Sequence, residues 1–177
     1  MDREERQSRP YKSLTALAAL FDFGKLSHAP ARFDFEELTS LNARLLQELE
    51  YDEVADRLEA EGIGGGAPFW EAVRPNLQVI SDVRQWWQIV AGPVEPQIED
   101  QRLFKTAREL LPPEPWRPES WPEWIAPVKA MTGAKGKALF HPLRLALTGR
   151  GDGPELKKLL PLIGRAKAEA RLAGRTA

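Results

Sequence analysis

The sequence predicts an all-α, multihelical protein with two consecutive helical-bundle subdomains. Apolar residues recur at spacings of three and four, glycines and prolines separate these stretches, and no hairpin signal joins alternating apolar runs. A chain of 177 residues with 42 % hydrophobic residues can bury one core or two small ones. We place a tail and the end of a preceding helical region at 1–40, a first subdomain at 41–96 and a second, basic one at 97–177.

The first helices come before a glycine-rich run. A short apolar stripe over 14–21 precedes a longer helix, for which Asp34 and Glu37 supply a start like a capping box. A third stripe over 54–58 ends in glycines at 62–66, which predict a flexible loop. The face that the longer helix is expected to bury consists of Phe35, Leu38, Leu41, Leu45, Leu46 and Leu49.

The second group of helices begins at Pro68, a residue that suits a first helical turn. Its apolar faces run over 69–80 and 83–90, and Pro75 is expected to kink or restart the helix between them. A further apolar stripe over 98–111 predicts a helix that stops at two consecutive prolines.

Residues 112–127 are rich in proline and tryptophan, with six of the fifteen prolines and three of the six tryptophans. This density of large aromatic side chains favours a stiff connection pinned onto a helical surface over a free ligand for an aromatic groove. After it we expect short helices, separated by glycines, near 129–132, 136–148, 154–163 and 165–173.

Charge is distributed unevenly along a chain whose formal net charge is -1. Residues 1–61 carry fourteen acidic and eight basic side chains, whereas residues 129–177 carry three acidic and eleven basic ones. The basic end indicates a polyanionic partner, although a solvated basic surface explains it equally well. No apolar run is long enough for a membrane span, and the charged N-terminus is unlike a signal peptide, so we expect a cytoplasmic protein that binds no membrane.

The sequence shows no catalytic constellation. It contains no cysteine, no Gly-x-Ser-x-Gly and no phosphate-binding glycine loop. Its two histidines, His28 and His141, have no metal-ligand neighbour at helical spacing, so no metal site is expected. For His141 a packed or capping position is favoured over a functional one.

Two stretches are more specific. They are LFDFGKLSHAPARFDFEELTSLN at 20–42 and TGAKGKALFHPLRLALTGR at 132–150, the second continuing through GPEL at 153–156 and LPLIG at 160–164. Together they resemble the C-terminal half of bacterial glutamyl-tRNA synthetases, which are class I aminoacyl-tRNA synthetases. The first is similar to the helices where the stem-contact region passes into the anticodon-binding region. The second is similar to the Pro-Leu-Arg-x-Ala-Leu-Thr-Gly signature of the terminal helical cage.

The resemblance implies a tRNA-reading part without the catalytic part. The His-x-Gly-His and Lys-Met-Ser-Lys-type motifs of this class are absent. We therefore expect no ATP or glutamate site in this chain, because ATP and Mg²⁺ belong to the catalytic Rossmann domain. The partners implied are glutamate tRNA and the catalytic half of the synthetase, and a monomer is the default expectation.

The resemblance also assigns anticodon contacts. Arg144, in the signature, matches an arginine that reads an anticodon base, and a guanidinium can hydrogen-bond a base edge or stack on its face. His141 holds a position where relatives can have another polar base contact. The turn that packs against the third anticodon base is matched by Gly153, Pro154 and Leu156.

A different segment, Arg74-Pro75-Asn76, is expected at the first anticodon base. Members that separate glutamate from glutamine tRNAs have arginine where this chain has Asn76. A shorter amide that both donates and accepts tolerates either pyrimidine, so the parent enzyme would also charge glutamine tRNA. Alternatively, Asn76 caps the helix that restarts after Pro75. Candidates for positioning tRNA phosphates, each equally explained as surface charge, are Lys135, Lys137, Arg150, Lys157 and Lys158.

A second function class remains open on the sequence. The chain could be a free-standing helical interaction module that has the same fold and binds a protein, through its acidic N-terminal part and the Trp/Pro segment. Such a module would bind tRNA weakly and without regard to the anticodon.

Overall fold

The computed structural model describes residues 13–25, 34–117 and 119–177. These residues form ten α-helices and no strand, which confirms the all-α prediction. Within them, no helix is both long and apolar enough to cross a lipid bilayer. Residues 1–12 and 26–33, which include His28 and the middle of the 20–42 stretch, lie outside the described residues.

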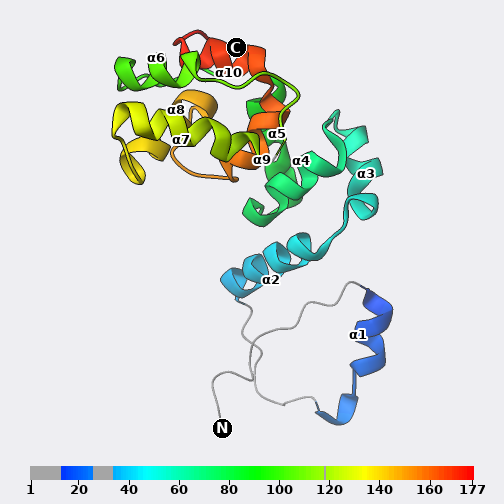
Figure 1. The fold of residues 1–177 in the computed structure, drawn as a ribbon. Coiled ribbons are helices and arrows are strands. Elements are labelled where there is room, and N and C mark those ends of the chain that lie inside the picture. Colours follow the sequence, from blue (N-terminus) through cyan, green and yellow to red (C-terminus); the bar gives the residue numbers. More distant parts are fainter. Residues whose placement is uncertain (1–12, 26–33, 118) are drawn as a thin grey trace.

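An arm leads away from the rest of the molecule (Figure 1). It consists of α1 (Leu14–Leu20), a 3-10 turn (Phe23–Lys25) and the first half of α2 (Phe35–Glu48). The side chain of Asp34 accepts hydrogen bonds from the backbone N–H groups of Glu36 and Glu37, which confirms the predicted helix start.

The prediction that α2 buries its whole apolar face is wrong. Phe35 is 75 % exposed and Leu38 is 48 % exposed, whereas Leu46 is buried. Only the C-terminal half of the helix reaches the core, because its first turns project along the arm (Figure 1).

The next helices are α3 (Tyr51–Ala60), α4 (Gly66–Val73) and α5 (Val83–Ala91). Pro75 lies in a 3-10 turn (Arg74–Asn76) directly after α4, and a second such turn (Ile80–Asp82) leads into α5, so the predicted helix restart is confirmed. The apolar side chains of α4 and α5 form the centre of the core, with Phe69, Trp70, Val73, Val83, Trp86 and Val90 buried.

The last helices are α6 (Gln101–Glu109), α7 (Ser120–Thr132), α8 (Lys137–Thr148), α9 (Leu156–Ile163) and α10 (Arg165–Leu172). The expectation of a connection up to residue 127 and a helix only near 129–132 is wrong, because α7 already begins at Ser120. Trp124 and Val128 are spaced by one helical turn and both are buried, and the Trp124 indole N–H donates to the Ala107 carbonyl at 2.7 Å. This buried anchor outweighs the backbone hydrogen bond that Pro127 cannot make.

One continuous core runs from α2 to α10. Helix α9 packs against α4 and α5 as well as against α10, and thus joins the two predicted subdomains. The boundary between the two subdomains at residue 96 stays a prediction.

Candidate nucleic-acid interface

A small pocket of about 200 Å³ lies where α7, α8 and the start of α9 meet. Two aromatic rings form one side of it: Trp121 from α7 and Phe140 from α8 are nearly parallel, with ring centroids 6.4 Å apart and an interplanar angle of 24°. The other lining residues are Arg144, Glu155, Leu156 and Lys157. Aromatic rings beside a guanidinium are the combination that proteins use to stack and hydrogen-bond an unpaired nucleobase.

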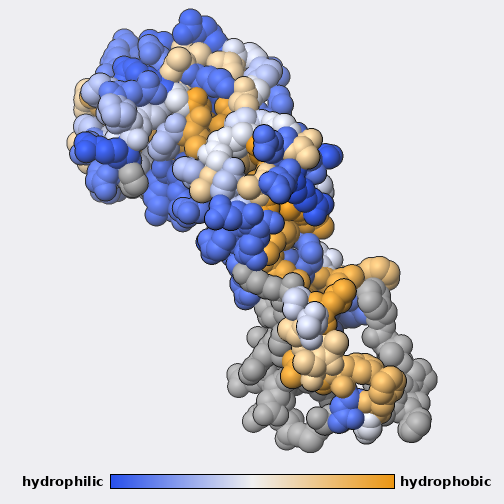
Figure 2. Space-filling view, turned by 90° about the vertical axis from the view of Figure 1, so that its right-hand side faces the viewer, coloured by the Kyte–Doolittle hydropathy of each residue, from blue (hydrophilic) through white to orange (hydrophobic). Residues whose placement is uncertain are grey.

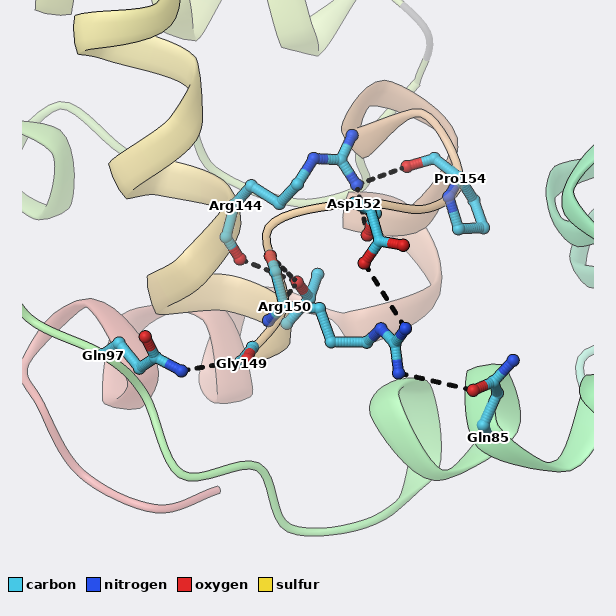
Figure 3. A network of polar contacts seen from close by, with 8 residues as sticks. Gln85, Gln97, Arg144, Gly149, Arg150, Asp152 and Pro154 are labelled. Carbon is cyan, nitrogen blue, oxygen red and sulfur yellow. Dashed lines mark hydrogen bonds and ion pairs between the residues drawn. The ribbon is translucent and has the colours of Figure 1, made fainter.

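Arg144 is held in place by the loop that follows its helix (Figure 3). Its Nη1 donates to the carbonyl oxygen of Pro154 at 2.9 Å and lies 3.4 Å from that of Asp152. Partial burial lowers the pKa of the guanidinium, and the nearby Asp152 carboxylate opposes that shift. The Nε and Nη2 groups make no hydrogen bond to the described residues. One side of the guanidinium is therefore held by the loop, and the N–H groups on the other side are free to donate.

The loop over 149–155 is tied to its surroundings at several points (Figure 3). The Thr148 hydroxyl donates to the carbonyl oxygen of Arg144 at 2.8 Å and accepts from the backbone N–H of Arg150 at 3.2 Å. Gln97 donates to the carbonyl oxygen of Gly149 at 3.1 Å. The Pro154 carbonyl is therefore presented to Arg144 by a supported loop.

The structure brings one group of predicted base contacts together. Arg144 and Leu156 line the pocket, while Pro154 is buried behind it and holds Arg144. His141 is half-buried on α8, and its ring packs against the backbone of Gly151, close to where a Cβ at that position would lie.

The other predicted base contacts lie on the turn between α4 and α5, outside this pocket. Arg74 donates to the Leu49 carbonyl at 2.7 Å and pairs with Glu50 at 3.3 Å. The Asn76 side chain is exposed and caps no helix: the side chain that accepts from backbone N–H groups before α5 is that of Asp82.

The predicted phosphate contacts differ in their surroundings. Lys135, just before α8, Lys137, the first residue of α8, and Lys158, on α9, are exposed. Lys157 forms an ion pair with Glu155 at 2.7 Å. A hydrogen bond from Lys157 lowers the pKa of the Glu155 carboxyl, against a smaller opposing effect of burial. Arg150 is directed toward α5 and has partners there (Figure 3).

Much of the basic excess over 129–177 serves the fold. Arg165, Lys167 and Arg171 donate to backbone carbonyl oxygens at or just beyond the ends of α5, α6 and α8. Cations at these positions satisfy acceptors that a helix end leaves free. Burial lowers the pKa of Lys167, and it lowers the pKa of Arg171 to about 10, at which Arg171 is still charged at neutral pH. Fewer basic side chains are therefore available to a polyanion than the sequence indicates.

Sequence reasoning missed Trp121 and Phe140 as parts of a site. From the sequence, Trp121 is assigned to the structural Trp/Pro segment over 112–127, and Phe140, the residue before His141, is given no role. The available signal was an aromatic residue one helical turn before a signature arginine, since residues at i and i+4 share a helix face.

A family model described as an anticodon binding domain matches residues 71–175. Glutamate–tRNA ligase 2 of Beijerinckia indica subsp. indica is 53 % identical over 170 residues, covering 95 % of this chain and 38 % of the relative. Glutamate–tRNA ligase 2 of Methylobacterium sp. (strain 4-46) is 54 % identical over 171 residues, covering 96 % and 38 %. The chain thus spans little more than a third of the length of these relatives.

Two solved structures share the fold. A glutamate tRNA ligase from Elizabethkingia meningosepticum in complex with its amino acid has a TM-score of 0.69 at 20 % identity, covering 86 % of this chain and 34 % of that one. The glutamate-tRNA synthetase of Elizabethkingia anophelis has a TM-score of 0.71 at 18 % identity, with the same coverage. At these identities the likeness concerns the fold alone.

Proposed function

Because this chain belongs to the anticodon-binding domain family, we propose that it recognises the anticodon of glutamate tRNA as part of a glutamate–tRNA ligase. The observation that carries the proposal is the pocket that Arg144, held by the Pro154 carbonyl, lines together with Trp121 and Phe140. Such a pocket suits one unstacked base of an RNA loop.

In this proposal an anticodon base enters the pocket and stacks on the exposed face of Phe140. The free N–H groups of Arg144 donate to acceptors on the edge of the base, while Leu156 packs against its ring. Gly153 and Pro154 shape the backbone that positions Arg144, and His141 supports the same loop from α8. Hydrogen bonds to a base edge carry sequence information, which contacts to phosphate do not.

Asn76 is the proposed contact to the first anticodon base. Its amide is exposed and caps no helix, so both its donor and its acceptor are available to RNA. We extend the proposal to glutamine tRNA on this ground, since an amide adapts to either pyrimidine. Arg74, held by Leu49 and Glu50, supports the turn that presents Asn76.

Phosphate contacts are assigned to the lysines around the pocket, Lys135, Lys137, Lys157 and Lys158. They would fix the position of the anticodon arm without reading its sequence. ATP and Mg²⁺ chemistry is assigned to the part of the relatives that this chain does not span, which would also be its protein partner. We further propose a cytoplasmic, monomeric protein.

The test is a titration of the chain with three transcripts at low and at moderate salt. They are glutamate tRNA, glutamine tRNA, and glutamate tRNA with its second anticodon base changed. Each is repeated with Arg144→Ala and with Arg175→Ala, a matched control that removes an exposed arginine of the same region. We expect binding of both natural tRNAs and a loss of about 1–3 kcal/mol on the base change.

Arg144→Ala should weaken binding of the natural tRNAs and abolish the discrimination against the changed base, while Arg175→Ala leaves both unchanged. Equal, purely salt-driven binding of all three transcripts would overturn base reading by this chain. Binding of glutamate tRNA alone would leave the pocket in place and overturn the role of Asn76.

A protein-binding function is the second candidate, and the arm favours it. Leu14 is 84 % exposed, Phe23 is 81 % exposed and Leu20 is 60 % exposed, and apolar surface gathers over the arm (Figure 2). Exposed apolar patches of this kind mark contacts with other proteins or domains. Capture of the catalytic part of a glutamate–tRNA ligase, with no anticodon preference in the titration, would favour this candidate over the first.

A further inference from the structure

Arg150 lies against side chains of helix α5. Its guanidinium carbon lies 5.1 Å from the centroid of the Trp86 ring. Its Nη1 donates to Gln85 Oε1 at 3.4 Å, and its Nη2 lies 3.4 Å from Asp152 Oδ1 (Figure 3). Its Nε is buried and has no hydrogen-bond acceptor among the described residues. The side chain is thus placed to bridge the loop after α8 to helix α5.

The same indole ring supports the loop at a second point. Gly153 lies so close to Trp86 that a Cβ there would be 2.3 Å from the ring atom Cη2. Trp86 itself is only 3 % exposed and belongs to the core. The loop therefore rests on one rigid surface through two of its residues, the Arg150 guanidinium and the Gly153 backbone.

This loop supplies the backbone oxygen atoms that hold Arg144. Pro154 follows Gly153 directly, and Asp152, whose carbonyl oxygen lies 3.4 Å from Arg144 Nη1, is the residue that pairs with Arg150. A continuous set of contacts consequently leads from Trp86 on α5 to the guanidinium in the base pocket on α8.

We propose that Arg150 and Trp86 are positioning residues for base recognition: they hold the loop whose Pro154 carbonyl orients Arg144, and Arg150 makes no contact with a phosphate. The inference rests on the proposed function, because it concerns the residue proposed to read the base. It requires a planar cation at position 150, since a guanidinium can lie on an aromatic face and donate from both ends of its fork.

The experiment compares Arg150→Lys with Arg150→Gln, with Arg175→Gln as the matched control for an exposed arginine. Affinity for glutamate tRNA and for the transcript with a changed second anticodon base is measured over a range of salt. Lysine keeps the charge that a phosphate needs and loses the planar fork. We expect both Arg150 variants to lose discrimination between the transcripts by about fivefold or more, with the salt dependence unchanged.

A double variant shows whether Arg150 acts through Arg144. In the Arg144→Ala background, Arg150→Gln should cause no further loss, because the group that it positions is already gone. The opposite pattern would overturn the inference: wild-type discrimination in Arg150→Lys, an additive loss in the double variant, and a salt slope reduced by about one in Arg150→Gln.

Hydrogen exchange of the free protein provides a readout that does not involve RNA. We expect faster exchange of the amides over 150–155 in Arg150→Lys and in Trp86→Phe, and no change in Arg175→Gln. If Arg144→Ala does not affect tRNA binding, the proposed function fails, and the exchange data still decide whether Arg150 holds the loop. Unchanged exchange in both variants would overturn the positioning role itself.

Discussion

Gly153 and Trp86 are in direct contact, with the glycine backbone lying against the edge of the indole ring. A Cβ at position 153 would be 2.3 Å from Cη2 and 2.6 Å from Cζ3 of Trp86. The glycine also has a φ of +116°, in a region that other residues rarely adopt. Both constraints act on the residue directly before Pro154, so the loop that fixes Arg144 requires glycine at this position.

Gly153→Ala should lower the free energy of unfolding by about 2–4 kcal/mol, because backbone strain and overlap with a buried ring add together. Gly133→Ala is the matched control: its φ is +71° and its Cβ would meet nothing within 4 Å, so it should cost only about 1 kcal/mol. Urea unfolding of both variants provides the comparison. Equal costs would mean that the indole ring can move aside.

Arg171→Met should destabilise the chain by about 2–4 kcal/mol, because it leaves buried carbonyl oxygens without donors. Arg171 is fully buried and donates to backbone oxygen atoms of Leu147, Gly92 and Ala177 at 2.7, 3.2 and 2.8 Å. Arg175→Met, at an exposed position, should change stability by no more than about 0.5 kcal/mol. A thermal melt of the two variants tests this difference, and similar melting temperatures would show that Arg171 is not needed for folding.

The helical class and most helix boundaries follow from apolar spacing, capping residues and prolines, because these are local properties of the chain. The elements that pack against a helix are distant in the sequence. Apolar spacing therefore does not show how much of a helix face is buried. Leu46 and Leu38 belong to one predicted stripe, yet the first is buried and the second is 48 % exposed. The helix was predictable, and its place on a projecting arm was not.

The candidate site shows the same limit. Arg144 is found from its signature, but the signature does not show that Trp121, more than twenty residues earlier, lines the same pocket. The positions of basic residues in the sequence do not show what these residues bind: Arg150, Arg165 and Arg171 contribute to a basic segment, yet each is hydrogen-bonded to another part of the fold. Only the arrangement of α5 to α10 separates these structural cations from the exposed lysines.

Leu14→Ser combined with Phe23→Ser should leave the stability of the isolated chain within about 0.5 kcal/mol, since both side chains are already exposed to water. The same pair should reduce capture of the catalytic part of the ligase, because the apolar patch of the arm is lost. Urea unfolding and a pull-down measure these effects, with Leu58→Ser as a buried comparison that lowers stability instead. Unaltered capture by the doubly substituted arm would assign the contact to another surface.

Glu155→Gln should strengthen binding of glutamate tRNA about threefold at low salt, because it removes a negative charge from the pocket wall and releases Lys157. The slope of log affinity against log salt should steepen as the freed lysine meets a phosphate. Glu169→Gln removes an exposed acidic group on α10 and serves as the control.

The pKa of Glu155 lies below its ordinary value, chiefly because Lys157 donates to the carboxylate, so this side chain stays ionised throughout the neutral range. The advantage of Glu155→Gln should therefore persist from about pH 8 down to about pH 5.5. Equal affinities of the wild type and Glu155→Gln would remove Lys157 from the set of phosphate contacts.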